Sequence, residues 1–215
     1  MSRSFAPVIL AASLLCVGIA QARDTREIEK TIELETGQTI RIDIPVAELR
    51  IEATERRDIG IELTVRCRWQ IGDCEDALAE LDVSSRSSSR RLTLELTGQR
   101  RWHTSLIGVE GTIQIPRTSA LEVKMGVADL DIRDVERDLR VDLGVGQVDL
   151  RLPEAKIGEV FVDVGIGRAH FLGGGKPQDE RRSFLVGNEI HWADGLGESE
   201  LEIDVGVGEV RIRLE

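Results

Sequence analysis

Three glycine triplets are the first residues in this sequence whose type and spacing could carry chemistry. They read Gly-Val-Gly at 144–146 and 206–208 and Gly-Ile-Gly at 165–167. Glycines at this spacing bind nucleotide phosphates when they form G-x-G-x-x-G at the beginning of a helix. Here the third glycine of that motif is absent, and each triplet lies between two runs of alternating apolar residues, a pattern typical of strands. We therefore interpret the triplets as corners between strands.

Carboxylates two residues before these corners could bind a cation. The same position occurs before two related corners, Pro45 and Gly126, and across the five corners it holds Asp43, Lys124, Asp142, Asp163 and Asp204. If Asp142 and Asp163 lie on adjacent turns of a stack, their carboxylates could share Ca²⁺. The alternative is a solvated face on which Lys124 pairs with Asp142 and Arg140 pairs with Glu122. We assign no metal and no cofactor, and name Asp142 and Asp163 as the ligands to examine.

Catalytic constellations are not evident. The histidines are His103, His170 and His191, and no Ser-His-Asp set can be assembled without assuming contacts, although chain order does not exclude one. Acidic residues number 39, too many to single out a glycosidase pair. We predict no enzyme. The tryptophans lie in or beside loops, where such residues more often pack irregular segments. If a binding site exists, we expect it at Trp102, His103 and Trp192.

The N-terminus predicts export. Residues 1–22 combine Arg3, an apolar run at 8–20 and the small-x-small site Ala20-Gln21-Ala22, which is the pattern of a cleaved signal peptide. Cys16 would permit a lipoprotein, but Leu15 stands where the small residue before a lipidated cysteine is needed. No later segment has the length of a membrane span. We expect an exported chain that begins near Arg23, periplasmic or else secreted.

Two cysteines remain after cleavage, Cys67 and Cys74. An even pair in an oxidising compartment predicts a disulfide. A zinc site is the alternative, but the pair lacks the short Cys-x-x-Cys spacing. The net charge of −11 argues against nucleic acid as a partner, because that binding depends on Lys and Arg.

Five segments repeat one pattern of six apolar residues around a corner, and the pattern predicts the fold. They cover 40–52, 121–133, 139–151, 160–172 and 201–213, with corners at Pro45, Gly126, Gly144, Gly165 and Gly206. We expect the six apolar residues to point inward and the corner glycines to permit a positive φ. Ordering one copy costs more free energy than its buried side chains supply, so copies must stack. The prediction is an all-β, single-domain β-solenoid over 23–215 with turns of roughly 20 residues.

Departures from the repeat mark its ends and insertions. Pro45 lacks an N–H, so we expect its copy to end the stack. Region 67–110 is predicted to be loop-rich, with a short helix at 73–81 and a solvated turn at 84–91, and 173–200 to be an insertion that includes one irregular turn. The copy at 201–213 is predicted to leave a free edge, where a second molecule could self-associate.

With these segments in view, the chain resembles the bacterial putative-adhesin β-solenoid family, a family of unknown function related to toast-rack domains. The strand pair at 40–52, the proline-terminated strand at 111–116, the glycine corners and the GNEIHW stretch at 187–192 carry the resemblance. It implies a β-solenoid of the bacterial envelope with no catalytic residues. Pro45 and the lack of a transmembrane anchor depart from the family pattern.

The sequence therefore predicts a non-enzymatic, exported envelope protein. It would act as a structural or adhesin-like interaction module, with an envelope protein or surface component as its partner. The alternatives are a secreted polysaccharide-active enzyme on a β-helix scaffold, and an envelope-stress or metal-responsive sensor.

Overall fold

The computed structural model describes residues 25–67, 74–98, 107–174, 179–182, 187–193 and 195–215. The predicted signal peptide, Trp102 and His103 lie outside these residues. Within the described residues the structure is all-β, with one short α-helix, α1 (Cys74–Glu80), and one short 3-10 helix, η1 (Glu154–Lys156). Its strands are β1 (Thr25–Glu33), β2 (Thr39–Asp43), β3 (Val46–Thr54), β4 (Asp58–Cys67), β5 (Asp82–Ser87), β6 (Arg91–Thr97), β7 (Ile107–Pro116), β8 (Leu121–Arg133), β9 (Leu139–Leu152), β10 (Ile157–Leu172), β11 (Asp179–Arg182), β12 (Asn188–Trp192) and β13 (Ser199–Leu214).

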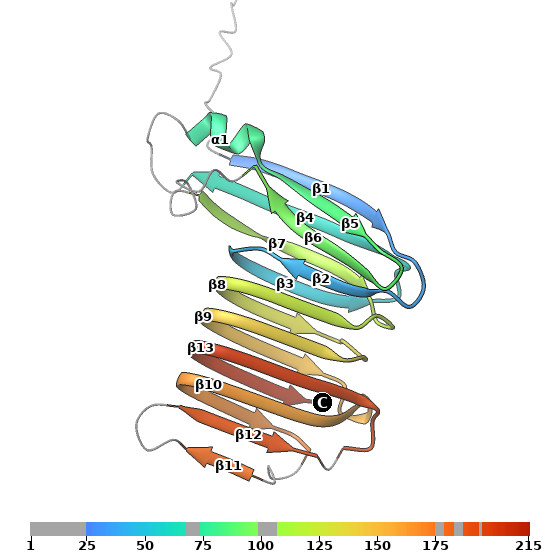
Figure 1. Ribbon diagram of the computed structural model, residues 1–215, viewed down its shortest axis with the longest axis vertical. Coiled ribbons are helices and arrows are strands. Elements are labelled where there is room, and N and C mark those ends of the chain that lie inside the picture. The colour runs from blue at the N-terminus through green and yellow to red at the C-terminus, as the bar shows by residue number, and fades with distance from the viewer. Residues whose placement is uncertain (1–24, 68–73, 99–106, 175–178, 183–186, 194) are drawn as a thin grey trace, which may run out of the picture.

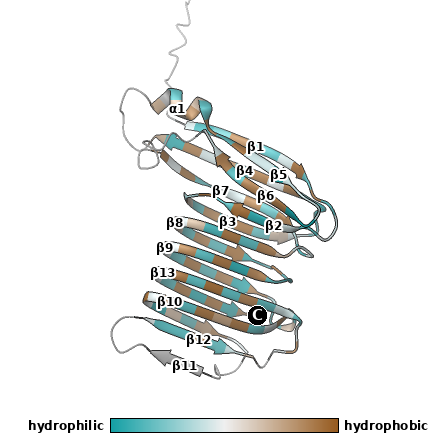
Figure 2. Ribbon diagram, in the orientation of Figure 1, coloured by the Kyte–Doolittle hydropathy of each residue, from teal (hydrophilic) through white to brown (hydrophobic). Residues whose placement is uncertain are grey.

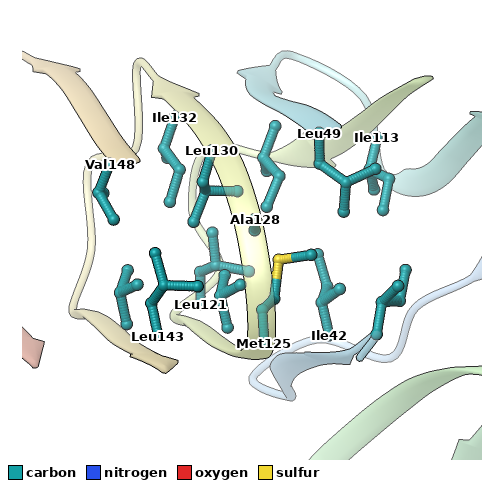
Figure 3. Packing of buried hydrophobic residues seen from close by; sticks show 14 of the residues in the cluster. Ile42, Leu49, Ile113, Leu121, Met125, Ala128, Leu130, Ile132, Leu143 and Val148 are labelled. Atoms are coloured by element: carbon teal, nitrogen blue, oxygen red, sulfur yellow. The ribbon is translucent and has the colours of Figure 1, made fainter. Parts of the chain in front are cut away.

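Each long strand bends at its glycine corner into two arms. The first arm of β9 buries Leu139, Val141 and Leu143, and the second arm buries Val148 and Leu150. Because successive side chains alternate between faces, each arm presents one apolar side. The arms of stacked strands therefore form two layers, whose apolar side chains meet in one core (Figure 3). Figure 1 shows the strands stacked along the long axis of the molecule, and Figure 2 shows apolar and polar residues alternating along them.

The two layers have different strand orders. The first-arm layer runs β5-β6-β2-β8-β9-β13-β10-β12-β11, and the second-arm layer runs β1-β4-β7-β3-β8-β9-β13-β10. The five copies of the repeat align as the sequence predicts. Ile40 lies opposite Leu121 and Leu121 opposite Leu139, while Val160 and Leu139 both lie opposite Leu201. The register of the core was therefore predicted correctly.

The order of the copies in the stack was not predicted correctly. β13 lies between β9 and β10 and is paired in parallel with both. The hairpin β11–β12 pairs outside β10, so the chain passes this hairpin and returns to insert β13 into the stack. This order does not confirm a regular solenoid of 20-residue turns. The free edge expected at 201–213 is wrong for the same reason, and Glu215 itself donates its N–H to the Leu152 carbonyl at 3.0 Å.

Pro45 does not end the stack. β2 and β3, which flank it, pair with β8 on one side and with β6 and β7 on the other. The N–H groups of Ile40 and Ile44 bond toward β8 and that of Thr39 toward β6, so position 45 faces the β6 side. The β2–β6 ladder ends at Asp43 and Glu95. The missing donor of Pro45 therefore lies just past the last pair of that ladder.

The glycines at the corners are needed for two separate reasons. Gly144 does not have a positive φ, contrary to expectation, but a Cβ there would lie 2.6 Å from the Gly126 carbonyl oxygen. The positive φ occurs two residues later, at Gly146, where φ is 143°. Both glycines thus allow neighbouring strands of the stack, which we call rungs, to approach closely, and the second glycine also permits the left-handed backbone.

The β1 end of the stack joins α1 through the predicted disulfide between Cys67 and Cys74, whose Cα atoms are 6.1 Å apart. The predicted helix at 73–81 is confirmed as α1. The turn expected at 84–91 is instead mostly strand, because Asp82–Ser87 pairs antiparallel with β6. No helix among the described residues is long and apolar enough to cross a bilayer.

Candidate interaction surface

An acidic row runs along the outer face of the first-arm layer. It consists of Asp142, Asp204, Asp163 and Glu189, which lie opposite one another on β9, β13, β10 and β12. The expectation that Asp142 and Asp163 lie on adjacent turns is therefore wrong, because the inserted β13 places Asp204 between them. Burial, followed by the charge of Glu202, raises the pKa of the Asp204 carboxyl, and Asp163 and Asp142 add to this effect.

Cation pairing on this face follows the strand order. Lys124 Nζ lies 3.8 Å from Asp142 Oδ2, as predicted. Arg140 pairs with Glu202 of β13 at 2.8 Å rather than with Glu122. Within the described residues, no three Asp, Glu, His or Cys side chains are grouped closely enough to hold a metal ion. The acidic row is thus a line of separate carboxylates spaced by strands, about 4.8 Å apart.

The described histidines occupy separate surface sites. His170 Nε2 lies 3.4 Å from Glu209 Oε1, and His170 aligns with Arg211 on the adjoining strand, as its place in the repeat predicts. His191 Nε2 lies 2.7 Å from Glu159 Oε1, beside the edge of the Phe161 ring. Each histidine contacts a carboxylate on a neighbouring strand.

Trp192 is a packing residue of the core, which was one of the two roles that the sequence offered for it, and not part of an exposed binding site. Its side chain is 1% exposed, and its ring centroid lies 5.5 Å from that of Phe171. The indole Nε1–H donates to the Gly174 carbonyl at 2.7 Å, which satisfies its single polar group. The tryptophan closes the β10 end of the core and is unavailable to stack on a ligand.

An apolar ridge along the corners is the surface feature that sequence reasoning missed. Each copy has two corner positions, such as Gly144 and Gly146 in β9, and the ridge consists of the residue between them. The five residues lie opposite one another on the stacked strands β3, β8, β9, β13 and β10: Val46, Val127, Val145, Val207 and Ile166. The last four are 42–49% exposed. We call this row the corner ridge.

The parity of the repeat explains why these side chains point outward. Leu143 and Val148 are both buried, yet their positions in the sequence differ by an odd number, so strict alternation cannot hold between them. The slip occurs at the corner, where Gly144, Val145 and Gly146 all avoid the core. An odd spacing between inward residues was visible in the sequence and could have identified the ridge.

A shallow groove of about 380 Å³ crosses the outer face of the second-arm layer. Acidic residues dominate its polar lining, namely Glu48, Glu110, Asp129, Asp131 and Asp149. Arg133 Nε donates to Asp131 Oδ1 at 3.0 Å, and Arg50 Nε lies 3.3 Å from Asp131 Oδ2. The hydrogen bond from Arg133 lowers the pKa of the Asp131 carboxyl. The Asp131 carboxylate of the groove is therefore held in an ion-paired cluster with two arginines.

Comparison with known proteins gives matches among solved structures alone. No family model and no curated protein matches the chain. A crystallised protein from Clostridium sporogenes ATCC 15579, called a putative cell adhesion protein, matches with a TM-score of 0.52 at 14% identity, over 89% of this chain and 100% of the other. The two proteins share a fold. This supports, at the level of architecture, the resemblance to the putative-adhesin family.

Two further matches superpose less well. A putative adhesin from Parabacteroides merdae ATCC 43184 has a TM-score of 0.30 at 18% identity, over 60% of this chain and 58% of the other. A putative adhesin from Parabacteroides distasonis ATCC 8503 has a TM-score of 0.29 at 11% identity, over 87% of this chain and 56% of the other.

Proposed function

We propose that this protein is an exported, non-enzymatic interaction module of the cell envelope, and that the corner ridge is its contact surface. The ridge carries the proposal. Four of its side chains remain nearly half exposed although the chain has ample polar residues for a surface. Contiguous exposed apolar residues with polar borders are typical of protein-binding sites.

The arrangement of the ridge fits a partner that is itself extended. Val127, Val145 and Val207 lie in register, so the ridge advances by one strand spacing, about 4.8 Å, per residue. The residues on either side of these valines are glycine, or alanine in the case of Ala128, and their small size keeps the valines prominent. We expect the partner to be an envelope protein or surface component with a complementary apolar strip.

Three observations support the cellular setting. The chain shares its fold with a protein called a putative cell adhesion protein. It contains a disulfide, which persists in oxidising compartments. Its first 22 residues have the composition of a signal peptide. A periplasmic location accommodates all three.

The test is co-sedimentation of the purified protein with envelopes isolated from the cells that produce it. We expect the wild-type protein to bind and Val145→Thr/Val207→Thr to bind at least tenfold more weakly, because two apolar contacts are replaced by hydroxyls. Leu196→Thr is the matched control, since Leu196 is 98% exposed and lies outside the ridge. Failure of the wild-type protein to bind would contradict the module, and release of sugar reducing ends during the incubation would indicate an enzyme.

A further inference from the structure

Within the part of the chain that the structure describes, the second arm of β10 is an edge of the sheet. β13 pairs with β10 along its whole length, whereas β12 covers β10 only at Val160–Val164. Among the strands that the structure describes, none pairs with the outer side of Ile166–Leu172, which we call the β10 edge. An unpaired strand presents a row of backbone N–H and C=O groups that can template a further strand.

Side chains along the β10 edge alternate in a way that specifies what could be added. Ala169 is buried and Phe171 is partly buried against Trp192, so both point toward the core. Arg168 and His170 are exposed on the outer face. An added strand would therefore meet apolar side chains on its inner side and basic side chains on its outer side.

Two arginines near this edge, one on β10 itself and one on the adjoining strand β13, lack partners among the described carboxylates. Arg168 and Arg213 are exposed, and neither forms an ion pair with a described Asp or Glu. The nearby Glu209 is already engaged, since its carboxylate lies 2.8 Å from Arg211 Nη2 and 3.4 Å from His170 Nε2. Two arginines without a described carboxylate partner thus lie near the β10 edge of a chain whose net charge is −11.

We propose that the β10 edge binds an extended acidic segment of a partner protein as an added β-strand. Backbone hydrogen bonds to the edge would supply affinity, while carboxylates at alternate positions would pair with Arg168 and Arg213. The inference rests on the proposed interaction role, but the site is distinct from most of the ridge and meets it only at Ile166. It names the partner's chemistry at this end of the stack.

The test uses a fluorescent, end-blocked peptide, Val-Glu-Val-Glu-Val-Glu-Val, titrated with the full mature protein and followed by anisotropy. We expect saturable binding, and no binding of the counterpart with lysine in place of glutamate. Two further peptides carry N-methyl groups on alternate backbone nitrogens, one set on odd residues and one on even. Because an added strand bonds through one edge, one methylated set should lose binding and the other should retain it.

Variants of the protein test the charge pairing. Arg168→Gln/Arg213→Gln should weaken binding about tenfold, since two exposed ion pairs are lost. Arg57→Gln/Arg137→Gln is the matched control, with the same change of charge at exposed arginines away from the edge. Circular dichroism verifies that both variants are folded.

Several results would overturn the inference. Equal binding of both N-methylated peptides would show attraction to a polyanion without strand addition. Binding of polyglutamate and dextran sulfate as tight as that of the Val-Glu peptide would show the same. Concentration-dependent oligomers that disappear in Arg168→Gln/Arg213→Gln would assign the edge to a second copy. Envelope binding without peptide binding would refute this inference and leave the proposed function intact, whereas loss of envelope binding alone would refute only the proposed function.

Discussion

Gly146 of β9 lies directly opposite Ala128 of β8, and a Cβ at position 146 would overlap the carbonyl oxygen of Ala128. The same relationship recurs between Gly208 and Gly146 and between Gly167 and Gly208. The second corner position therefore sets how closely consecutive rungs can stack.

Gly146→Ala should destabilise the protein by several kcal/mol, because a positive φ and a backbone overlap coincide there. Gly37→Ala is the matched control. Gly37 also has a positive φ, 86°, but a Cβ at this position would have no atom within 4 Å, so strain of about 1 kcal/mol is expected. Urea unfolding measures both, and equal losses would contradict the stacking role of Gly146.

Asp204→Asn should stabilise the protein at pH 7. The pKa of Asp204 is raised in the folded state above its ordinary value of 3.8. The ionised carboxylate therefore opposes folding, and it does so fully at pH values above the raised pKa. The gain should shrink as the pH falls toward 4 and the wild-type carboxyl becomes protonated. Thermal unfolding should show a Tm higher by roughly 1–3 °C at pH 7 and no difference at pH 3.

Asp131→Asn should have the opposite sign. The pKa of Asp131 is lowered by Arg133, so its carboxylate favours folding above the ordinary value of 3.8. The variant should therefore unfold at a lower temperature at pH 7, by roughly 1–3 °C, and the difference should vanish as the pH falls through the lowered pKa. A loss that persists unchanged at low pH would point to packing instead of charge.

Loss of the disulfide should cost about 2–3 kcal/mol, the value expected for so short a loop from chain entropy. Cys67→Ser/Cys74→Ser removes the link between β4 and α1. Urea unfolding under oxidising conditions measures the loss, and dithiothreitol should lower the stability of the wild-type protein but not that of the variant. A reductant effect on the variant would show that another cause operates.

The central place of β13 predicts slow hydrogen exchange. Its amides should exchange as slowly as those of β9, because both strands are paired on two sides, whereas those of β1 should exchange faster. Ile203→Ala, which empties a buried position on β13, should cost about 2–5 kcal/mol. Fast exchange across β13 would place it at an edge and contradict this strand order.

Much of the core could be predicted from the sequence because inward positions obey local rules. Alternation placed Leu121, Leu139 and Leu201 in one aligned column, and the structure confirms it. Rung order obeys no such rule. The copies carry the same apolar pattern, so Leu139 packs as well beside Val160 as beside Leu201, and only the path of the intervening chain decides between them.

The candidate site was less predictable for a related reason. Alternation was extended through the corner, which assigned Val145 to the core although it is 46% exposed. Trp192 lies outside the regular copies, so the sequence left both a packing role and a binding role open, and the structure shows that it closes the core at their end. The β10 edge depends on the insertion of β13 and could not be seen before the strand order was known.

The insertion of β13 also constrains how the molecule folds. A nascent chain completes β10 before β13 exists, and nothing then prevents β10 from docking on β9 in the same apolar register. That premature pairing must open again before β13 can intercalate, so the native order is reached late, through contacts between residues far apart in the chain. A chain held open until β13 has emerged, as during passage through a translocation channel, would avoid the trap.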